Sequence, residues 1–97
     1  MAGYILSKAA KSDLIGIARY GDRTWGIAMS DDYRDGIIRQ FESLVENPRL
    51  FREREELSPP VRICPFGSHI ILYRLNDKNQ IEILRVRHAR EDWSEEL

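Results

Sequence analysis

The sequence predicts an α+β fold: an N-terminal strand, a helical hairpin, and then a three-stranded antiparallel sheet. Three observations support this prediction. Two long segments near the N-terminus carry apolar residues at helical spacing. Three β-rich segments, separated by turn residues, follow one another in the last third of the chain. A single short β-prone segment, Tyr4–Leu6, precedes the helices. The expected layout is therefore two helices packed on one face of a small sheet.

The first helix is expected from about residue 8 to 24, because Ser7 is a good N-cap and the break falls near Trp25 and Gly26. Its apolar stripe consists of Leu14, Ile17, Ala18, Gly21 and Trp25. The second helix is expected from about Ile27 to Glu46, and Asn47-Pro48 ends it. Its stripe consists of Tyr33, Ile37, Phe41, Leu44 and Val45. A short turn between two such helices predicts a helical hairpin.

The strands are expected at Val61–Phe66, His69–Leu75 and residues 80–88. The middle strand is apolar on both faces, which is typical of a central strand. Pro65 cannot donate a ladder hydrogen bond, so its strand is expected at an edge or with a bulge. Residues 49–60 are charged and end in two prolines, which indicates a connector between helix and sheet.

The composition indicates one small domain, residues 1–97, with 42% hydrophobic residues. The chain has 15 basic and 16 acidic residues, so its overall charge gives no argument for nucleic-acid binding. Direct binding to nucleic acid is not expected. The single Cys64 cannot form an internal disulfide and is expected to be buried. No apolar run approaches a membrane span, and the N-terminus does not resemble a signal peptide. The chain is therefore expected in the cytoplasm, without membrane contact.

Cationic side chains on the predicted strands are the candidate functional residues. Arg85 and Arg87 share one face of the last strand and His88 lies on the other, while Arg62 approaches Arg85 if the strands are suitably ordered. Arginine clusters on strands can bind anionic groups. The alternative is that these arginines form surface ion pairs with nearby acidic residues. The candidate contact residues are Arg62, His69, Arg85, Arg87, His88 and Trp93, the last of which follows the strand.

Catalysis and metal binding have little support in the sequence. Ser68 and His69 are adjacent on a strand and point to opposite faces, so they cannot act as a pair. The two histidines lack the closely spaced partners of a structural zinc site. No catalytic residues, metal or cofactor are therefore expected. The four tyrosines and Trp25 are expected to pack in the core or between the helices and the sheet: Tyr4, Tyr20, Tyr33, Tyr73 and Trp25.

Taken together, these residues resemble the ParE branch of the RelE/ParE superfamily of toxins from bacterial toxin–antitoxin systems. The resemblance covers nearly the whole chain. It is carried by residues 4–14, Ile17, Tyr20, Trp25-Gly26, Asn47-Pro48, Arg62, Gly67, His69, Tyr73-Arg74, Ile81, Ile83, Arg85, His88 and Asp92. It implies a toxin neutralised by a cognate antitoxin, ParD-like or similar, and inhibition of DNA gyrase. RelE-like relatives instead cleave mRNA on the ribosome, and this activity is the alternative.

Physical arguments favour the gyrase branch. RNA cleavage needs a general base, a general acid and cations around the scissile phosphate. RelE-like toxins resemble one another in a sheet rich in lysine and arginine with a late tyrosine, whereas here Trp93 follows the last strand. The lysines are Lys8, Lys11 and Lys78, and none is well placed for the sheet centre. His88 remains a candidate base under the alternative. The sequence therefore predicts a protein-binding toxin without catalytic residues.

Overall fold

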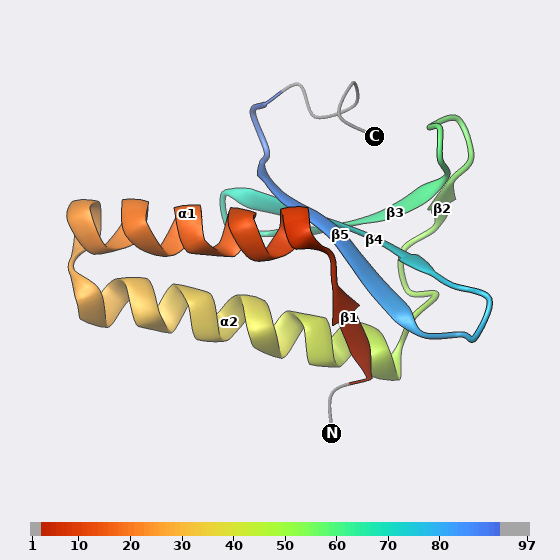
Figure 1. The fold of residues 1–97 in the computed structure, drawn as a ribbon, viewed down its shortest axis with the longest axis horizontal. Helices are drawn as coiled ribbons and strands as arrows, with labels where there is room; N and C mark the ends of the chain where they lie inside the picture. Colours follow the sequence, from red (N-terminus) through yellow and green to blue (C-terminus); the bar gives the residue numbers. More distant parts are fainter. Residues whose placement is uncertain (1–2, 92–97) are drawn as a thin grey trace.

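The computed structural model describes residues 3–91. The elements are β1 (Tyr4–Leu6), α1 (Lys8–Trp25), α2 (Ile27–Glu46), β2 (Glu53–Arg54), β3 (Val61–Phe66), β4 (His69–Leu75) and β5 (Ile81–His88). Figure 1 shows the two helices side by side, with the sheet at one end of the hairpin. The helices and one face of the sheet share the main hydrophobic core. The predicted α+β class and order of elements are confirmed.

The sheet has five strands in the order β1-β5-β4-β3-β2. The last three long strands are antiparallel neighbours, as predicted. Two details differ from the prediction. β1 joins the sheet as a parallel neighbour of β5, with Tyr4 opposite Ile81. β2, within the predicted connector, pairs with the start of β3.

The edge position predicted for β3 is correct for only part of the strand. β2 pairs with Val61 and Arg62 alone, so β3 lies inside the sheet there and forms its edge further on, where Pro65 stands. The irregularity lies in β5 instead. Leu72 is opposite Arg85 and Tyr73 is opposite Ile83, which leaves Leu84 as the extra residue of a bulge.

Ser7 begins α1 and also ties it to the sheet. Its Oγ accepts a hydrogen bond from the Ala10 N–H at 2.9 Å and donates one to the Leu84 carbonyl at 2.7 Å. The predicted N-cap is confirmed, and it fixes the first turn of α1 against β5. At the other end α1 extends to Trp25, and Gly26 has a φ of 90°. This left-handed conformation favours glycine and turns the chain into α2.

Replacing Ser7 with alanine should lower the free energy of unfolding by about 1 to 2 kcal/mol, because both hydrogen bonds are lost. Urea denaturation would measure the change. Ser12→Ala is the matched control, since Ser12 is exposed on the same helix and alanine is the better helix former. Equal effects of the two substitutions would contradict the capping role.

The core lies on both faces of β4. On the helix side, Ile71 and Tyr73 pack with the α2 residues Ile37 and Phe41. On the opposite face, Ile70 and Leu72 form a second cluster with Val61, against which Leu57 packs. The central position predicted for β4 is confirmed. The charged segment before β3 is thus more than a connector, because its Leu57 covers the far face of the sheet.

Candidate functional site

Four of the candidate residues form two pairs at the end of β5, and Arg62 lies apart from them. His69 and His88 are directly opposite in the pairing of β4 with β5. Arg85 and Arg87 lie opposite Leu72 and Ile70, which belong to the far-face cluster, so the two arginines share that face as predicted. Trp93 lies outside the described residues.

Arg62 does not approach Arg85. It pairs in register with Tyr73, which belongs to the helix-side core, whereas Arg85 pairs with Leu72 of the far-face cluster. Its guanidinium donates to the Phe51 carbonyl at 2.5 Å and helps to fix the segment before β2. The strand order that an approach of Arg62 to Arg85 requires is not present, because β4 separates their strands and the two side chains start on opposite faces.

Asp13 on α1 joins the two arginines of β5. Its carboxylate accepts from Arg85 Nε at 2.9 Å and from Arg85 Nη2 at 3.0 Å. It also accepts from the Val86 backbone N–H at 2.9 Å, and Arg87 Nη1 lies 3.6 Å away. The Asp13 side chain is only 10% exposed. This cluster was missed in the sequence, where Asp13 lies off the apolar stripe of its helix.

The Asp13 carboxylate offsets positive charge of the two arginines on β5, Arg85 and Arg87. Arg85 makes a two-point ion pair with one carboxylate, the geometry that a guanidinium favours. Arg87 also contacts Glu91, so part of the predicted surface pairing is present. The principal partner, however, is 72 residues away in the sequence from Arg85. Both guanidinium groups are therefore committed to partners within the chain.

Tyr33 on α2 fixes the histidine pair and the turn beside it. The His69 Nδ1 lies 2.7 Å from the Tyr33 hydroxyl, which also accepts from the Ser68 N–H at 3.1 Å. The rings of His69 and His88 stand edge to face with centroids 5.5 Å apart. Gly67, at a φ of +54°, leaves no room for a Cβ beside the Tyr33 hydroxyl. Tyr33 thus connects the helical hairpin to the end of the sheet.

The environment of His69 lowers its pKa from the ordinary value of 6.5, first through burial and then through the neighbouring His88. Glu91 acts in the opposite direction. His88 accepts a hydrogen bond at Nδ1 from the Arg90 N–H at 3.2 Å. In the neutral ring this acceptor role leaves the proton on Nε2 of His88, which is then a hydrogen-bond donor.

Acidification should therefore destabilise the protein through His69. The unfolded chain binds a proton near pH 6.5, above the lowered pKa of the folded state. Stability is then full above that pH and falls as the pH drops toward the folded pKa. Urea unfolding at pH 7.5 and 5.5 would measure the loss. His69→Gln, which keeps a partner for Tyr33, should show a smaller loss, and an unchanged loss would exclude His69 as the group.

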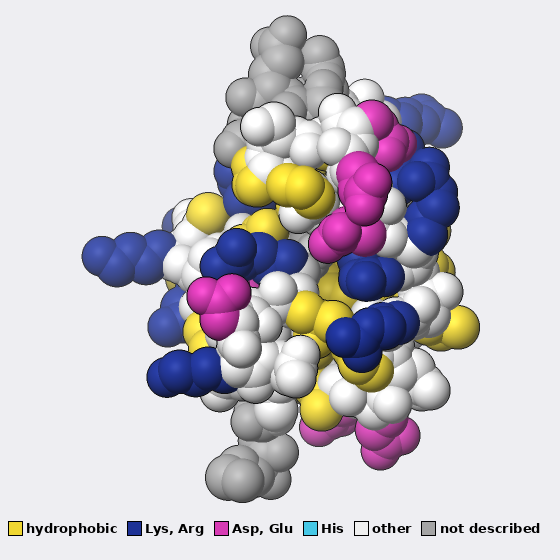
Figure 2. Space-filling view, turned by 90° about the vertical axis from the view of Figure 1, so that its right-hand side faces the viewer, with side chains coloured by type: hydrophobic (Ala, Val, Ile, Leu, Met, Phe, Trp, Pro, Cys, Tyr) yellow, Lys and Arg dark blue, Asp and Glu magenta, His cyan; other side chains and the backbone are white. Residues whose placement is uncertain are grey.

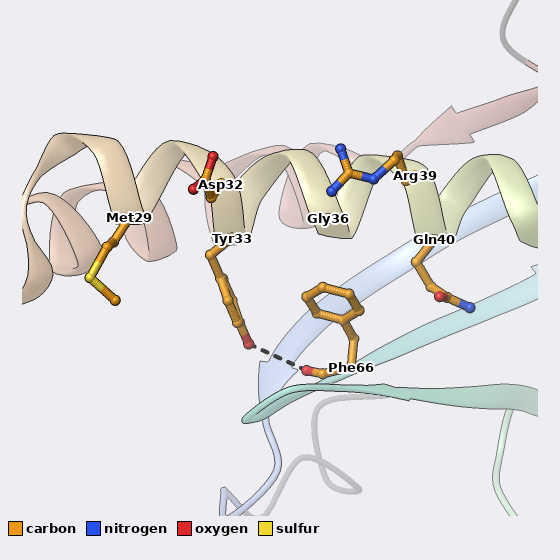
Figure 3. A pocket seen from close by; sticks show the side chains of 7 residues that line it. All are labelled: Met29, Asp32, Tyr33, Gly36, Arg39, Gln40 and Phe66. Carbon is orange, nitrogen blue, oxygen red and sulfur yellow. Dashed lines mark hydrogen bonds between the residues drawn. The ribbon is translucent and has the colours of Figure 1, made fainter.

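Two hollows lie in this part of the molecule, and Tyr33 lines the second of them. The first, here called the histidine pocket, has a volume of about 440 Å³ and lies between α1 and the ends of β4 and β5. Its walls include Gly16, Ile17, Tyr20, Trp25, His69 and His88. The second, here called the α2 hollow, has a volume of about 570 Å³ and is bounded by Met29, Tyr33, Gly36 and Phe66. Figure 3 shows the Tyr33 and Phe66 side chains between α2 and the sheet, with the hydroxyl directed at the Phe66 carbonyl.

Two of the aromatic residues predicted for the core are instead exposed. Tyr20 is 56% exposed and Trp25 is 41% exposed. Their rings are in contact, with centroids 5.7 Å apart, and Trp25 also lies 6.0 Å from Tyr33. Helical spacing placed Trp25 on the apolar stripe, and Tyr20 was expected in the core as an aromatic residue of the same helix. They line the histidine pocket because the last turns of α1 extend beyond the strands (Figure 1).

Within residues 3–91, no group of three or more His, Cys, Asp or Glu side chains is placed to hold a metal ion. The helices in this part of the chain are too short or too polar to cross a membrane. Cys64 is buried, as predicted, and burial raises its pKa. The fold and this site define a small α+β protein whose cationic strand residues are paired internally and whose helical hairpin carries exposed aromatic rings.

Comparisons with known proteins identify the family. A family model described as the ParE toxin of type II toxin–antitoxin system, parDE, matches residues 4–93, so the chain belongs to the ParE toxin family. Toxin ParE1 of Caulobacter vibrioides is 35% identical over 91% of this chain and 90% of its own length. Toxin ParE1 of Mycobacterium tuberculosis is 31% identical over 97% of this chain and 96% of its own length.

A solved structure supports the fold. A chain from the chromosomal ParDE TA system from P. aeruginosa superimposes with a TM-score of 0.74 and 20% identity. The match covers 88% of this chain and 92% of that one. The resemblance to ParE-like toxins is thereby confirmed at the level of family and fold.

Proposed function

We propose that this ParE-family toxin acts in the cytoplasm as a single domain that inhibits DNA gyrase and so blocks DNA replication. A cognate antitoxin neutralises it by direct binding. The observation that carries the proposal is membership of the ParE toxin family over residues 4–93. The proposed contact residues are His69, Arg85, Arg87 and His88 at the end of β5, Trp93 after that strand, and Arg62, which lies apart from Arg85 on the other face of the sheet.

The paired charges at the end of β5 support binding without catalysis. RNA cleavage needs cations directed at a phosphate, together with a base and an acid. Here the Asp13 carboxylate occupies the Arg85 guanidinium, and Tyr33 occupies one ring nitrogen of His69. An attacking ribose and its phosphate would have to displace these partners. The geometry therefore favours a docking surface over an endoribonuclease site.

The charge pattern also argues against direct nucleic-acid binding. The face drawn in Figure 2 carries Lys and Arg side chains mixed with Asp and Glu around exposed hydrophobic atoms. A nucleic-acid surface is typically a continuous basic patch. The net charge of −1 agrees with this argument.

Purified protein should inhibit supercoiling by gyrase and leave translation in a cell extract unchanged. Co-purified antitoxin should restore supercoiling, and induction without the antitoxin should stop growth. Codon-specific cuts in mRNA during translation, with gyrase unaffected, would replace the proposal by the endoribonuclease alternative. Normal growth on induction would indicate a binding module without toxicity.

A further inference from the structure

The histidine pocket lies between two unlike walls. α1 contributes an apolar and aromatic wall, whereas the end of the sheet contributes a wall that carries two imidazole rings. The first wall includes Gly16, Ile17, Tyr20 and Trp25, and the second includes His69, Val86 and His88. The volume of about 440 Å³ is within the usual range of pockets that enclose a small molecule. The pocket therefore has the size and the mixture of apolar and polar groups that a small ligand requires.

The hydrogen bonds of Tyr33 set the tautomer of His69. The Tyr33 hydroxyl has one proton, which it donates to the Phe66 carbonyl at 3.3 Å. The Ser68 N–H donates to this hydroxyl at 3.1 Å, and His69 Nδ1 lies 2.7 Å from it. All three contacts are hydrogen bonds only when Nδ1 of His69 also carries a proton and donates. Nε2 of neutral His69 is then a hydrogen-bond acceptor.

His88 has the opposite tautomer. Its Nδ1 accepts from the Arg90 N–H at 3.2 Å, so the proton of the neutral ring is on Nε2. Within residues 3–91, neither Nε2 atom of the two histidines has a hydrogen-bond partner. The two rings are also neighbours, with centroids 5.5 Å apart. The wall formed by the sheet therefore offers an acceptor and a donor close to each other.

The charges of the lining favour a neutral ligand. Asp13 lines the pocket, and its carboxylate already accepts from Arg85 and from the Val86 N–H. The described lining contains no Lys or Arg side chain that would pair with a phosphate or carboxylate group of a ligand. An anionic ligand would thus lose its hydration next to a carboxylate and gain no ion pair in return.

The aromatic wall indicates that the ligand is flat. Tyr20 is 56% exposed and Trp25 is 41% exposed, so part of each ring is open to a ligand. Aromatic side chains stack on nucleobases regardless of base identity, because every base has a π-face. Gly16 leaves room beside these rings, since a Cβ built there meets no atom within 4 Å. Nucleobases are neutral as well as flat, and the edge of adenine places a ring-nitrogen acceptor beside an amino donor.

We propose that the histidine pocket binds a free nucleobase or nucleoside with an adenine-like edge. The amino group of the base donates to His69 Nε2, and a ring nitrogen accepts from the Nε2–H of His88. The base stacks beside Tyr20 and Trp25. This site takes a small molecule, and it holds whether or not gyrase is the target. An unpaired base in a nucleic-acid strand has the same edge but brings phosphates, which the lining disfavours.

Calorimetry would measure the binding of adenosine to the full chain, and NMR of the histidine side-chain nitrogens would locate it. Purine riboside, which lacks the amino group, is the matched control for the ligand. Adenosine should shift the Nε2 resonances of His69 and His88 and should bind about tenfold more tightly than purine riboside. Adenosine monophosphate and a single-stranded oligodeoxyadenylate should bind no more tightly than adenosine.

Two pairs of variants test the two walls. Gly16→Phe should place a ring in the pocket and weaken adenosine binding about tenfold or more, whereas Gly16→Ala adds a single methyl group and should change it little. His88→Phe keeps a ring without the donor and should also weaken binding about tenfold. His88→Gln keeps an N–H donor and should retain most of the affinity.

The absence of adenosine binding would overturn the proposal. So would equal binding of adenosine to Gly16→Phe and Gly16→Ala, or equal binding of adenosine and purine riboside. Tighter binding of adenosine monophosphate or of the oligonucleotide would overturn it in favour of a ligand that carries phosphate. Gyrase inhibition is measured separately, so a failure of the adenosine experiment leaves the proposed function to its own test.

Discussion

Asp13→Ala should lower the free energy of unfolding by about 3 kcal/mol, because the Arg85 guanidinium and the Val86 N–H lose their hydrogen-bond acceptor and Arg87 loses one of its ion-pair partners. Asp13 is 10% exposed and Arg85 is 21% exposed, so water replaces the lost carboxylate only in part. The Val86 N–H lies on the side of β5 that β1 leaves unpaired beyond Leu6, and Asp13 is its acceptor. The substitution should therefore loosen both α1 and the end of β5.

Urea denaturation and hydrogen exchange would measure the two parts of this effect. The exchange rate of the Val86 amide should rise more than that of the Ile71 amide in the central strand. Asp22→Ala is the matched control, since Asp22 is an exposed carboxylate on the same helix. A change smaller than about 1 kcal/mol for Asp13→Ala would show that the ion pair adds little to stability.

A double substitution separates the contribution of the ion pair from the cost of removing the carboxylate beside a partly buried guanidinium. Removing Asp13 alone leaves the guanidinium of Arg85 without this carboxylate, which costs more than removing both partners. Asp13→Leu with Arg85→Leu should therefore be more stable than Asp13→Leu alone.

The same comparison of stabilities decides how an Arg85→Ala variant is interpreted in a toxicity assay. Lost toxicity identifies a contact residue only if the variant remains folded.

The sequence predicted the helices well because their signals are local. Ser7, the apolar stripe of α2 and Gly26 all act within a few residues of their positions, and each appears in the structure as expected. The predicted start of the last strand differs by one residue, since β5 begins at Ile81. The order of strand, hairpin and antiparallel strands followed from these signals.

The pairing of β1 with β5 and of β2 with β3 could not be predicted, because it depends on contacts between residues that are distant in the sequence or carry no strand pattern. β1 contains three residues and pairs with β5 across more than seventy positions, so no local pattern indicates its neighbour. β2 contains two residues within a highly charged segment. The bulge at Leu84 also has no sequence signal, although it places Arg85 on the opposite face of the sheet from Ile83.

Asp13 shows why the site was harder to predict than the fold. A charged residue beside an apolar stripe usually faces solvent, and periodicity alone assigns it there. α1, however, lies against the free edge of β5, where the Val86 N–H requires an acceptor. Tyr20 and Trp25 show the opposite error. Both lie in the last turns of α1, beyond the end of the sheet (Figure 1), so these apolar rings remain at the surface.

Phe41→Ala should lower the free energy of unfolding by about 3 to 5 kcal/mol, because Phe41 is fully buried where α2 meets β1. Its ring lies 5.3 Å from the Tyr4 ring, centroid to centroid. β1 has only three residues, so this contact contributes to holding it beside β5. The cavity left by alanine should therefore release β1 before the rest of the sheet unfolds.

Thermal unfolding would detect the global change as a fall in Tm of more than about 12 °C, and hydrogen exchange would detect the release of β1. Phe41→Leu is the matched control and should cost less than about 1.5 kcal/mol, because leucine fills most of the same volume. Exchange at Leu6 should increase in the alanine variant and change little in the leucine variant. If both variants lose the same stability, the ring contact with Tyr4, and not the buried volume, is the decisive contribution of Phe41. That result would make β1 depend on a single aromatic pair.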